Sequence, residues 1–318
     1  MDKILIDKDI PFIEGVLDPY FEIVRKNGSE ICREDVRDAV ALIVRTRTKC
    51  GRELLEGSAV RLVATATIGT DHIDTGWCSA NGIQVESAPG CNSGGVCQYV
   101  FSALSALDLS PADENGRQMV LGVVGVGHVG SKVADKGRSL GYRVLENDPP
   151  RGLPLSLEEL LEKSDIVTVH IPLEGNRDFV GTDFFGKMKR GASFINASRG
   201  DVLVDNALLD ARKSLGKVVL DVWRNEPHID LRMLEAADIA TPHIAGYSIQ
   251  GKANGTTAVV RAVGRAFGIG ELCNFTVNLH LPQPSAYDIM EDDRALRSSP
   301  DSFEQLRGNY SYRDETIS

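Results

Sequence analysis

Residues 125–130 read Gly-Val-Gly-His-Val-Gly, and this pattern constrains the fold more than any other part of the sequence. It follows the apolar run Val120 to Val124 and opens a stretch of helical character, Lys132 to Leu140. Three such glycines permit a tight turn, close approach of the backbone to a ligand, and packing of helix on strand. The glycines are Gly125, Gly127 and Gly130. Because free amides at a helix start attract an anion, the pattern predicts a site for the pyrophosphate of a dinucleotide.

The next predicted strand ends in an acid that supports the same interpretation. Asp148 follows Arg143 to Asn147, about 20 residues after the glycines, as dinucleotide-binding folds require. A carboxylate there accepts hydrogen bonds from both ribose hydroxyls and repels a 2′-phosphate, so we expect NAD rather than NADP. The backbone amides of His128 and Val129 are expected to face the phosphates, with the His128 side chain in solvent.

Short runs rich in β-branched residues predict a parallel sheet downstream of Met119. Helical stretches separate these runs, so we expect one doubly wound α/β sheet of Rossmann type. Its six predicted strands are Val120 to Val124, Arg143 to Glu146, Ile166 to His170, Ser193 to Asn196, Val218 to Val222 and Ile239 to Ala240. A second α/β unit is predicted upstream from three strands, Ile4 to Ile6, Ala41 to Val44 and Arg61 to Ala64.

The length of 318 residues exceeds what a single core usually serves and predicts two domains. Val96 to Leu107 is apolar almost all round, which suits a helix buried between domains, with a boundary just before it. Lys252 to Phe267 is predicted to be a helix that returns to the first domain, and the tail from Leu281 an extended or partly ordered arm. The expected division is 1–92 and 258–282 for a substrate domain, 93–257 for an NAD-binding domain and 283–318 for a C-terminal arm.

Composition and charge argue against several classes of protein. A net charge of −10 with scattered Lys and Arg opposes binding to nucleic acid. No apolar run approaches the roughly 20 residues of a membrane helix, and the first residues lack a secretory signal, so we expect a cytoplasmic protein. The six cysteines form no Cys-x-x-Cys pair and no zinc-like spacing, so we expect reduced thiols and no metal.

Three side chains with complementary chemistry follow the last three predicted strands: Arg199, Glu226 and His243. Parallel strands gather their carboxyl ends at one edge, so we expect these side chains to converge. A carboxylate beside an imidazole makes a base suited to neutral pH, and an arginine binds a carboxylate through two N–H groups. Taken singly, each is more often a surface ion-pair member or a structural histidine. The ordered set favours oxidation of a 2-hydroxy acid, with His243 accepting the hydroxyl proton.

The motifs around these residues resemble those of the D-isomer-specific 2-hydroxyacid dehydrogenase family. They are Asn196-Ala197-Ser198-Arg199-Gly200, Asn225-Glu226-Pro227 and Pro242-His243-Ile244-Ala245-Gly246. The resemblance covers nearly the whole chain and implies that Arg199 binds substrate while Glu226 and His243 perform acid–base catalysis. It also implies a two-lobed molecule whose smaller, discontinuous substrate domain is flavodoxin-like, and a homodimer.

The resemblance further implies contacts to cofactor and substrate. The implied cofactor contacts beyond the glycine turn and Asp148 are Ile171, Ala197, Ser198, Arg199, Asp221 and Gly246. The implied substrate contacts are Thr46, Thr67 and Tyr247. Four stretches are similar to family members that act on a small phosphorylated 2-hydroxy acid: Thr65 to Asp74, Ala88 to Asn92, Asp148 to Arg151 and His243 to Tyr247. The candidate phosphate partners by charge alone are Arg45, Arg47 and Lys49, with solvated loop cations as the alternative.

Some features depart from the family pattern, and they keep alternatives open. Gln98 stands where relatives usually carry Glu, and the connections after Arg151, after Leu173 and around Ser214 to Lys217 look short. The C-terminal arm resembles only the start of the family's dimerisation domain. The alternatives are a family member acting on 3-phosphoglycerate or D-lactate, and a non-catalytic NAD-sensing protein of the corepressor type.

Overall fold

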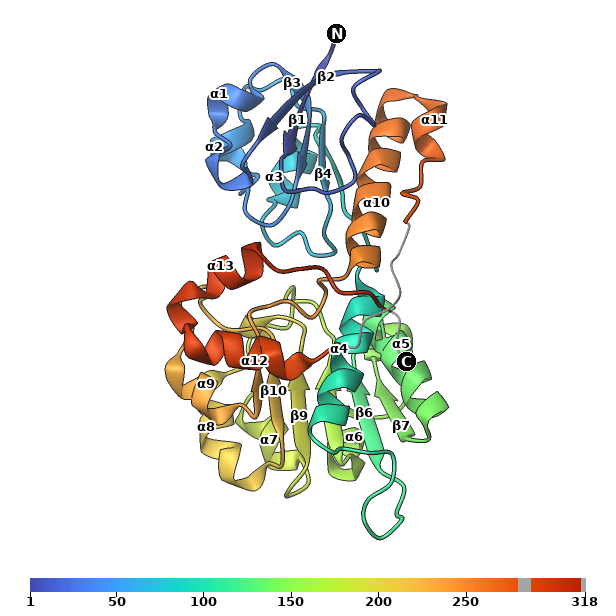
Figure 1. Cartoon of the computed structure of the whole chain (residues 1–318), viewed down its shortest axis with the longest axis vertical. Coiled ribbons are helices and arrows are strands. Elements are labelled where there is room, and N and C mark those ends of the chain that lie inside the picture. Colours follow the sequence, from blue (N-terminus) through green and yellow to red (C-terminus); the bar gives the residue numbers. More distant parts are fainter. Residues whose placement is uncertain (280–286, 316–318) are drawn as a thin grey trace. The chain divides into compact units, whose positions relative to one another are not determined.

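The structure is a computed structural model, and it describes residues 1–279 and 287–315. The chain divides into two compact units, each built on an open parallel sheet with helices (Figure 1). The first unit combines Met1–Asn92 with the described residues from Ser248 to 279. The second combines Ser93–Tyr247 with residues 287–315. No helix in the described ranges has the length and apolar character needed to cross a membrane.

The sheet of the first unit has five parallel strands in the order β2-β1-β3-β4-β5, which is the flavodoxin-like order. The strands are β1 (Lys3–Asp7), β2 (Glu22–Lys26), β3 (Ala39–Val44), β4 (Leu62–Thr65) and β5 (Gln84–Glu86). The two strands at the edges, β2 and β5, were not predicted. Both carry several polar residues, because only one side of an edge strand pairs and much of it faces solvent. The helices of four or more residues are α1 (Arg33–Val36), α2 (Arg52–Leu55), α3 (Thr75–Ala80), α10 (Ile249–Phe267) and α11 (Gly270–Cys273).

Helix α10 explains where the chain returns to the first unit. It begins at Ser248, whose hydroxyl accepts a hydrogen bond from the amide of Gly251 at 3.0 Å. A Cβ at Gly255 would lie 2.8 Å from the carbonyl oxygen of Ala66, so this helix packs tightly against the first unit early in its length. The predicted return at residue 258 was therefore wrong by ten residues, since the unit resumes at Ser248. The sequence pattern predicted helix α10, but it did not indicate which turn of that helix first packs on the first unit.

The sheet of the second unit has six parallel strands in the order β11-β10-β9-β8-β6-β7, and the prediction of one doubly wound sheet is confirmed. The strands are β6 (Val120–Val124), β7 (Arg143–Asn147), β8 (Ile166–Val169), β9 (Ser193–Asn196), β10 (Val218–Leu220) and β11 (Ile239–Ala240). The strand order reverses at β6, which pairs with β7 on one side and β8 on the other. Open α/β sheets bind ligands beyond the carboxyl ends of the strands at such a reversal.

Two apolar clusters cover the two faces of this sheet. One is formed by α4 and α5 with β6, and includes the fully buried Val100 and Leu121. The other is formed by the helices from α6 to α9, and includes a group of edge-to-face phenylalanines, Phe184, Phe185 and Phe194. The helices are α4 (Ser93–Ala106), α5 (His128–Leu140), α6 (Leu157–Lys163), α7 (Thr182–Lys187), α8 (Asp205–Ala211), α9 (Leu231–Ala236), α12 (Ile289–Ser298) and α13 (Phe303–Gly308). Five short 3₁₀ helices lie at 28–30, 149–151, 200–202, 212–214 and 300–302 among the described residues.

The carboxyl-terminal segment was predicted to be an extended or partly ordered arm, but its residues 287–315 are ordered and largely helical. It folds into α12 and α13 and packs on the second unit, with Leu296 and Phe303 fully buried. Arg297 donates hydrogen bonds to the carbonyls of Leu234 and Ala237, each at 2.8 Å. In the charged run 291–294 only Glu291 and Arg294 are exposed, whereas Asp293 is buried and accepts a hydrogen bond from the amide of Ala240 at 2.7 Å. The tail residues 281–286, which contain the two prolines, lie outside the described residues.

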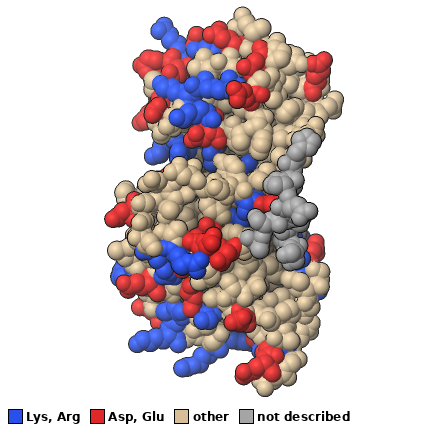
Figure 2. Space-filling view, viewed as in Figure 1, with Lys and Arg blue, Asp and Glu red and all other residues tan. Residues whose placement is uncertain are grey.

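Figure 2 shows Lys and Arg interspersed with Asp and Glu over the viewed face of both units.

Candidate active site

The glycine turn lies between β6 and α5, at the reversal of the strand order. Gly125 has φ +85°, and a Cβ there would lie 2.7 Å from the carbonyl oxygen of His170. A Cβ at Gly130 would come within 3.0 Å of the carbonyl oxygen of Gly125, so helix and turn touch through bare backbone. A Cβ at Gly127 meets nothing within 4 Å. The first and last glycines are thus required by packing, whereas the middle one faces the open space that a phosphate needs.

Asp148 lies at the end of β7 and is tied to the same turn. Its Oδ2 accepts a hydrogen bond from the amide of Val126 at 2.7 Å, and Arg151 donates to the carbonyl oxygen of Val126. The carboxylate and the glycine turn are therefore held side by side, which is the arrangement that a ribose and its adjoining pyrophosphate require.

His170 and Ile171 follow β8 on the other side of the turn. The Ile171 side chain adjoins Gly125, and the His170 ring makes a 3.0 Å hydrogen bond with the hydroxyl of Thr168. Burial lowers the pKa of His170 to about 4, so this imidazole is neutral at physiological pH. A neutral ring beside the turn adds no charge to the predicted phosphate site.

The loop after β9 carries Ala197, Ser198 and Arg199. The carboxamide oxygen of Asn196 accepts hydrogen bonds from the amide and the hydroxyl of Ser198 at 3.0 and 2.8 Å. A Cβ at Gly200 would come within 3.0 Å of the backbone of Trp223, so this loop packs directly on the loop after β10. That second loop carries Glu226. The loop that carries Arg199 and the loop that carries Glu226 are therefore in direct backbone contact at Gly200.

Glu226 and His243 are brought together as predicted. The Oε2 of Glu226 lies 2.7 Å from Nδ1 of His243, and its Oε1 accepts the amide of Trp223 at 2.9 Å. Burial raises the pKa of Glu226, but the charge of His243, the hydrogen bond to it and the charge of Arg307 outweigh burial and lower it. Glu226 is therefore a carboxylate that accepts, so the proton sits on Nδ1 and the other ring nitrogen, Nε2, is left as a base.

Asp221 fixes the loop that carries His243. The backbone of His243 has φ +57°, an uncommon conformation for a residue with a side chain. Its amide donates to the carbonyl oxygen of Asp221 at 2.8 Å. The carboxylate of Asp221 accepts the amides of Ile244 and Ala245 at 2.7 and 3.0 Å, and the hydroxyl of Thr241 at 2.7 Å. Burial raises the pKa of Asp221, while His243 and these hydrogen bonds oppose the rise.

Arg313 holds the same loop from the carboxyl-terminal segment, and sequence reasoning missed it. Its guanidinium donates to the carbonyl oxygens of Ile244, at 2.8 Å, and of Ala245. It also donates to Gln98 Oε1 at 3.0 Å and stacks over the ring of Tyr287 at 4.5 Å. Gln98, the departure from the family pattern, is therefore a partner of this arginine. No motif marks Arg313, because its role depends on how the segment folds back.

Tyr247 follows Gly246 at the end of the His243 loop. Its hydroxyl accepts a hydrogen bond from Nε of Arg307 at 3.1 Å, and its ring packs edge-to-face on Tyr310 and Tyr312. The structure therefore anchors this predicted substrate contact against the carboxyl-terminal segment.

Thr46 and Thr67, also predicted to bind substrate, belong to the first unit. They follow β3 and β4 at the carboxyl ends of those strands. The hydroxyl of Thr67 lies 2.7 Å from that of Thr65 and donates to the carbonyl oxygen of Gly69 at 3.1 Å. Two of the nearby candidate phosphate partners reach Asp9. Arg45 donates to its carbonyl oxygen at 3.1 Å, and Arg47 lies 3.6 Å from its carboxylate.

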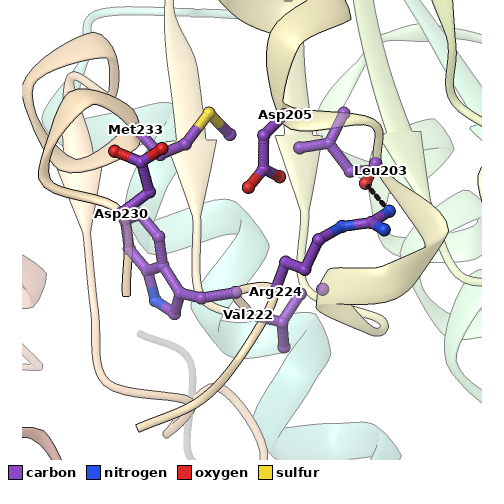
Figure 3. Close-up of a pocket in the computed structure, with 8 residues that line it drawn as sticks. Leu203, Asp205, Val222, Arg224, Asp230 and Met233 are labelled. Atoms are coloured by element: carbon purple, nitrogen blue, oxygen red, sulfur yellow. Dashed lines mark hydrogen bonds between the residues drawn. The ribbon is translucent and has the colours of Figure 1, made fainter. Parts of the chain in front are cut away.

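A small cavity lies behind the Glu226 loop, and Figure 3 shows its lining. Arg224 crosses it and donates to the carbonyl oxygen of Leu203 at 2.6 Å, while the Asp205 carboxylate faces the same space. Its volume of about 10 Å³ holds no more than a single water, so it is not a substrate site. Within residues 1–279 and 287–315, no three His, Cys, Asp or Glu side chains gather to hold a metal.

Comparison with known proteins identifies the family of this site. The family model described as "D-isomer specific 2-hydroxyacid dehydrogenase, NAD binding domain" matches residues 109–245, which include the glycine turn, Arg199, Glu226 and His243. The chain is 44% identical to erythronate-4-phosphate dehydrogenase of Bacteroides fragilis, over 98% of this chain and 97% of that protein. It is 39% identical to the protein of the same name from Salmonella arizonae, over 98% and 92% of the two lengths.

Solved structures show the same fold at lower identity. An NAD-bound 3-phosphoglycerate dehydrogenase of Entamoeba histolytica has a TM-score of 0.72 at 23% identity, covering 88% of this chain and 99% of that one. A D-lactate dehydrogenase of Aquifex aeolicus, solved with NAD and lactic acid, has a TM-score of 0.66 at 24% identity, covering 88% and 100%. The Bacteroides fragilis alignment spans 342 positions against 318 residues here, so this chain lacks residues that the relative has. The chain belongs to the D-isomer-specific 2-hydroxyacid dehydrogenase family and carries its NAD-binding domain.

Proposed function

We propose that this enzyme oxidises 4-phospho-D-erythronate at C2 to 3-hydroxy-2-oxo-4-phosphooxybutanoate, a step of pyridoxal phosphate biosynthesis. The observation that carries the proposal is the 2.7 Å contact between Glu226 and His243, made by loops that follow neighbouring strands of the NAD-binding unit. The substrate follows from the near full-length identity of 39–44% to proteins named erythronate-4-phosphate dehydrogenase.

His243 accepts the proton of the C2 hydroxyl. Because Nδ1 donates to the Glu226 carboxylate, Nε2 carries the free lone pair that takes this proton. The ring becomes an imidazolium, and the negative charge of Glu226, held by the amide of Trp223, stabilises it. The carbon–oxygen double bond forms as the C2 hydrogen leaves with its electron pair.

Arg199 anchors the substrate carboxylate and polarises the 2-oxygen. A guanidinium makes two parallel hydrogen bonds with a carboxylate, which fixes the orientation of C2 relative to the base. NAD, when bound, supplies the acceptor for the hydride. We assign its binding to Gly125, Gly127, His128, Val129, Gly130, Asp148, Ile171, Ala197, Ser198, Arg199, Asp221 and Gly246. For Asp221 we assign an indirect role, because both of its carboxylate oxygens already accept hydrogen bonds from the protein.

Thr46, Thr67 and Tyr247 are the proposed further substrate contacts. The loop cations Arg45, Arg47 and Lys49 are the candidates for the substrate phosphate, because each lies in the loop after β3. We also propose a homodimer in the cytosol. All six cysteines are free thiols in the structure, which fits a reducing compartment.

Steady-state turnover with NAD on a panel of acids tests the proposal. We expect kcat/KM for 4-phospho-D-erythronate to exceed that for D-lactate by at least about a hundredfold, because an unpaired phosphate site costs several kcal/mol. It should exceed that for D-3-phosphoglycerate by about tenfold or more, because that acid is one hydroxylated carbon shorter and holds its phosphate at a different distance from C2. Preference for either other acid would replace the substrate assignment and keep the family. Absence of turnover on every acid, with NAD still bound, would instead favour an NAD-sensing protein without catalysis.

A further inference from the structure

A cation of the carboxyl-terminal segment lies against the catalytic pair. Arg307, on α13, places Nη1 3.8 Å from Oε2 of Glu226, the oxygen that also meets His243. Its Nε donates to the hydroxyl of Tyr247 at 3.1 Å. Only 14% of the Arg307 side chain is exposed. All of these residues belong to the second unit, so the contact is built into one folded body.

We propose that Arg307 is a positioning residue of the acid–base pair, which keeps Glu226 ionised and turned toward His243. This inference rests on the proposed function, since it assigns a role within the same site. At 3.8 Å the guanidinium acts on Glu226 by charge and leaves the short hydrogen bond to His243 intact. Its own orientation is fixed by the Tyr247 hydroxyl, so the charge stands at a defined point.

The charges around the pair determine the direction of the effect. His243 and Arg307 face Glu226 directly, Glu304 lies 3.5 Å behind Arg307, and the buried Asp221 faces His243. Arg307 keeps its charge at every working pH. It therefore disfavours an added proton on the Glu226–His243 pair, and without it the protonated, inactive pair forms at a higher pH.

Two substitutions separate charge from shape at this position. Arg307→Gln removes the charge, and Arg307→Lys keeps it. The matched control is Arg294→Gln on α12 of the same segment, where the side chain is 62% exposed and pairs with Asp288 at 3.5 Å. Arg294→Gln makes the same change of residue type at a position that does not contact Glu226 or His243.

We expect Arg307→Gln to lower kcat about tenfold and to move the acidic limb of the kcat/KM profile up by about one pH unit. The KM for NAD should stay within about twofold of the wild type, because Arg307 acts on the base and not on the cofactor. In Arg307→Lys the acidic limb of the kcat/KM profile should lie at the wild-type pH, and kcat should be close to the wild-type value. Arg294→Gln should match the wild type in all three quantities.

A second readout does not depend on turnover. In protein labelled with [¹⁵N]histidine, the ring shifts of His243, assigned with a His243→Asn variant, report which nitrogen carries the proton. We expect the neutral ring with its proton on Nδ1 to give way to the doubly protonated ring at a higher pH in Arg307→Gln than in the wild type, and at the wild-type pH in Arg307→Lys. If the wild type turned over no 2-hydroxy acid, the proposed function would fail. The ring shifts of His243 would still test the effect of Arg307 on the protonation of the pair. Unchanged ring shifts and an unmoved acidic limb in Arg307→Gln, with only weaker substrate binding or lower thermal stability, would overturn the inference.

Discussion

Asp221 and Arg313 bind the backbone of the same two residues, Ile244 and Ala245. The carboxylate of Asp221 accepts the amides of Ile244 and Ala245, and the guanidinium of Arg313 donates to the carbonyl oxygens of the same residues. Both side chains are buried, at 1% and 9% exposure. The backbone of the loop that carries His243 is therefore held by two charges of opposite sign that lie 92 residues apart in the sequence, from 221 to 313.

Loss of Arg313 should loosen this loop as well as destabilise the fold. In Arg313→Met the two carbonyl oxygens lose their donors and Asp221 loses a facing positive charge, so we expect a loss of about 3 kcal/mol in unfolding free energy. Urea unfolding measures that loss, and hydrogen exchange of the 244–246 amides measures the loosening. Arg294→Met, at an exposed site of the same segment, is the control. Wild-type exchange at these amides in Arg313→Met would contradict the clamp.

His243→Asn should abolish most of the activity and spare cofactor binding. Asparagine at this position offers no base, so we expect kcat to fall by about 10²–10⁴-fold. The NAD affinity, measured by fluorescence titration, should change little, because the imidazole meets substrate rather than phosphate or ribose. Glu226→Gln should show a smaller loss, since the base remains but its tautomer and imidazolium are no longer supported. Equal activity of His243→Asn and wild type would rule out the proposed base.

Alanine at two glycines of the turn should have separable effects. In Gly130→Ala the new Cβ would press on the Gly125 carbonyl, so we expect a lower melting temperature together with lost NAD binding. In Gly127→Ala the Cβ meets open space in the free protein, so the melting temperature should hold while NAD affinity falls about tenfold or more. Differential scanning calorimetry with and without NAD distinguishes the two. A Gly127→Ala variant with unchanged NAD affinity would place the pyrophosphate elsewhere.

The buried imidazole of His170 should make the stability of the NAD-free protein depend on pH. Its folded-state pKa of about 4 lies below the ordinary 6.5, so the unfolded chain binds more protons between these values. The stabilisation is complete above pH 6.5 and is lost as the pH falls toward 4. Allowing for partial exposure of the ring, we expect this loss to be about 2 kcal/mol.

His170→Gln should flatten that part of the profile, which urea unfolding at a series of pH values measures. His128→Gln removes an exposed histidine and is the control. Parallel profiles for the wild type and His170→Gln between pH 4 and 6.5 would show that His170 titrates freely in the folded protein.

The interior of the six-stranded sheet could be predicted because β6, β8, β9 and β10 are buried along their whole length and are therefore mostly apolar. The glycine turn, Asp148 and the residues after β9, β10 and β11 could be placed for a related reason, since parallel strands gather their carboxyl ends at one edge. The edge strands β2 and β5 carry polar residues and gave no such signal. The residue at which α10 rejoins the first unit depends on which helix turn meets a backbone, and periodicity does not contain that information.

The sequence by itself determined the fold class, the family and the residue types of the catalytic set, because each is recorded in local patterns of a few residues. Only the tertiary structure decided that the carboxyl-terminal segment folds back as α12 and α13, and that Arg307 and Arg313 thereby reach Glu226 and the His243 loop. An arginine in a polar tail looks the same in sequence whether it is solvated or buried. The partners of Arg313 are backbone carbonyls and the partner of Arg307 is the Glu226 carboxylate, and these groups come within reach only when the chain has folded.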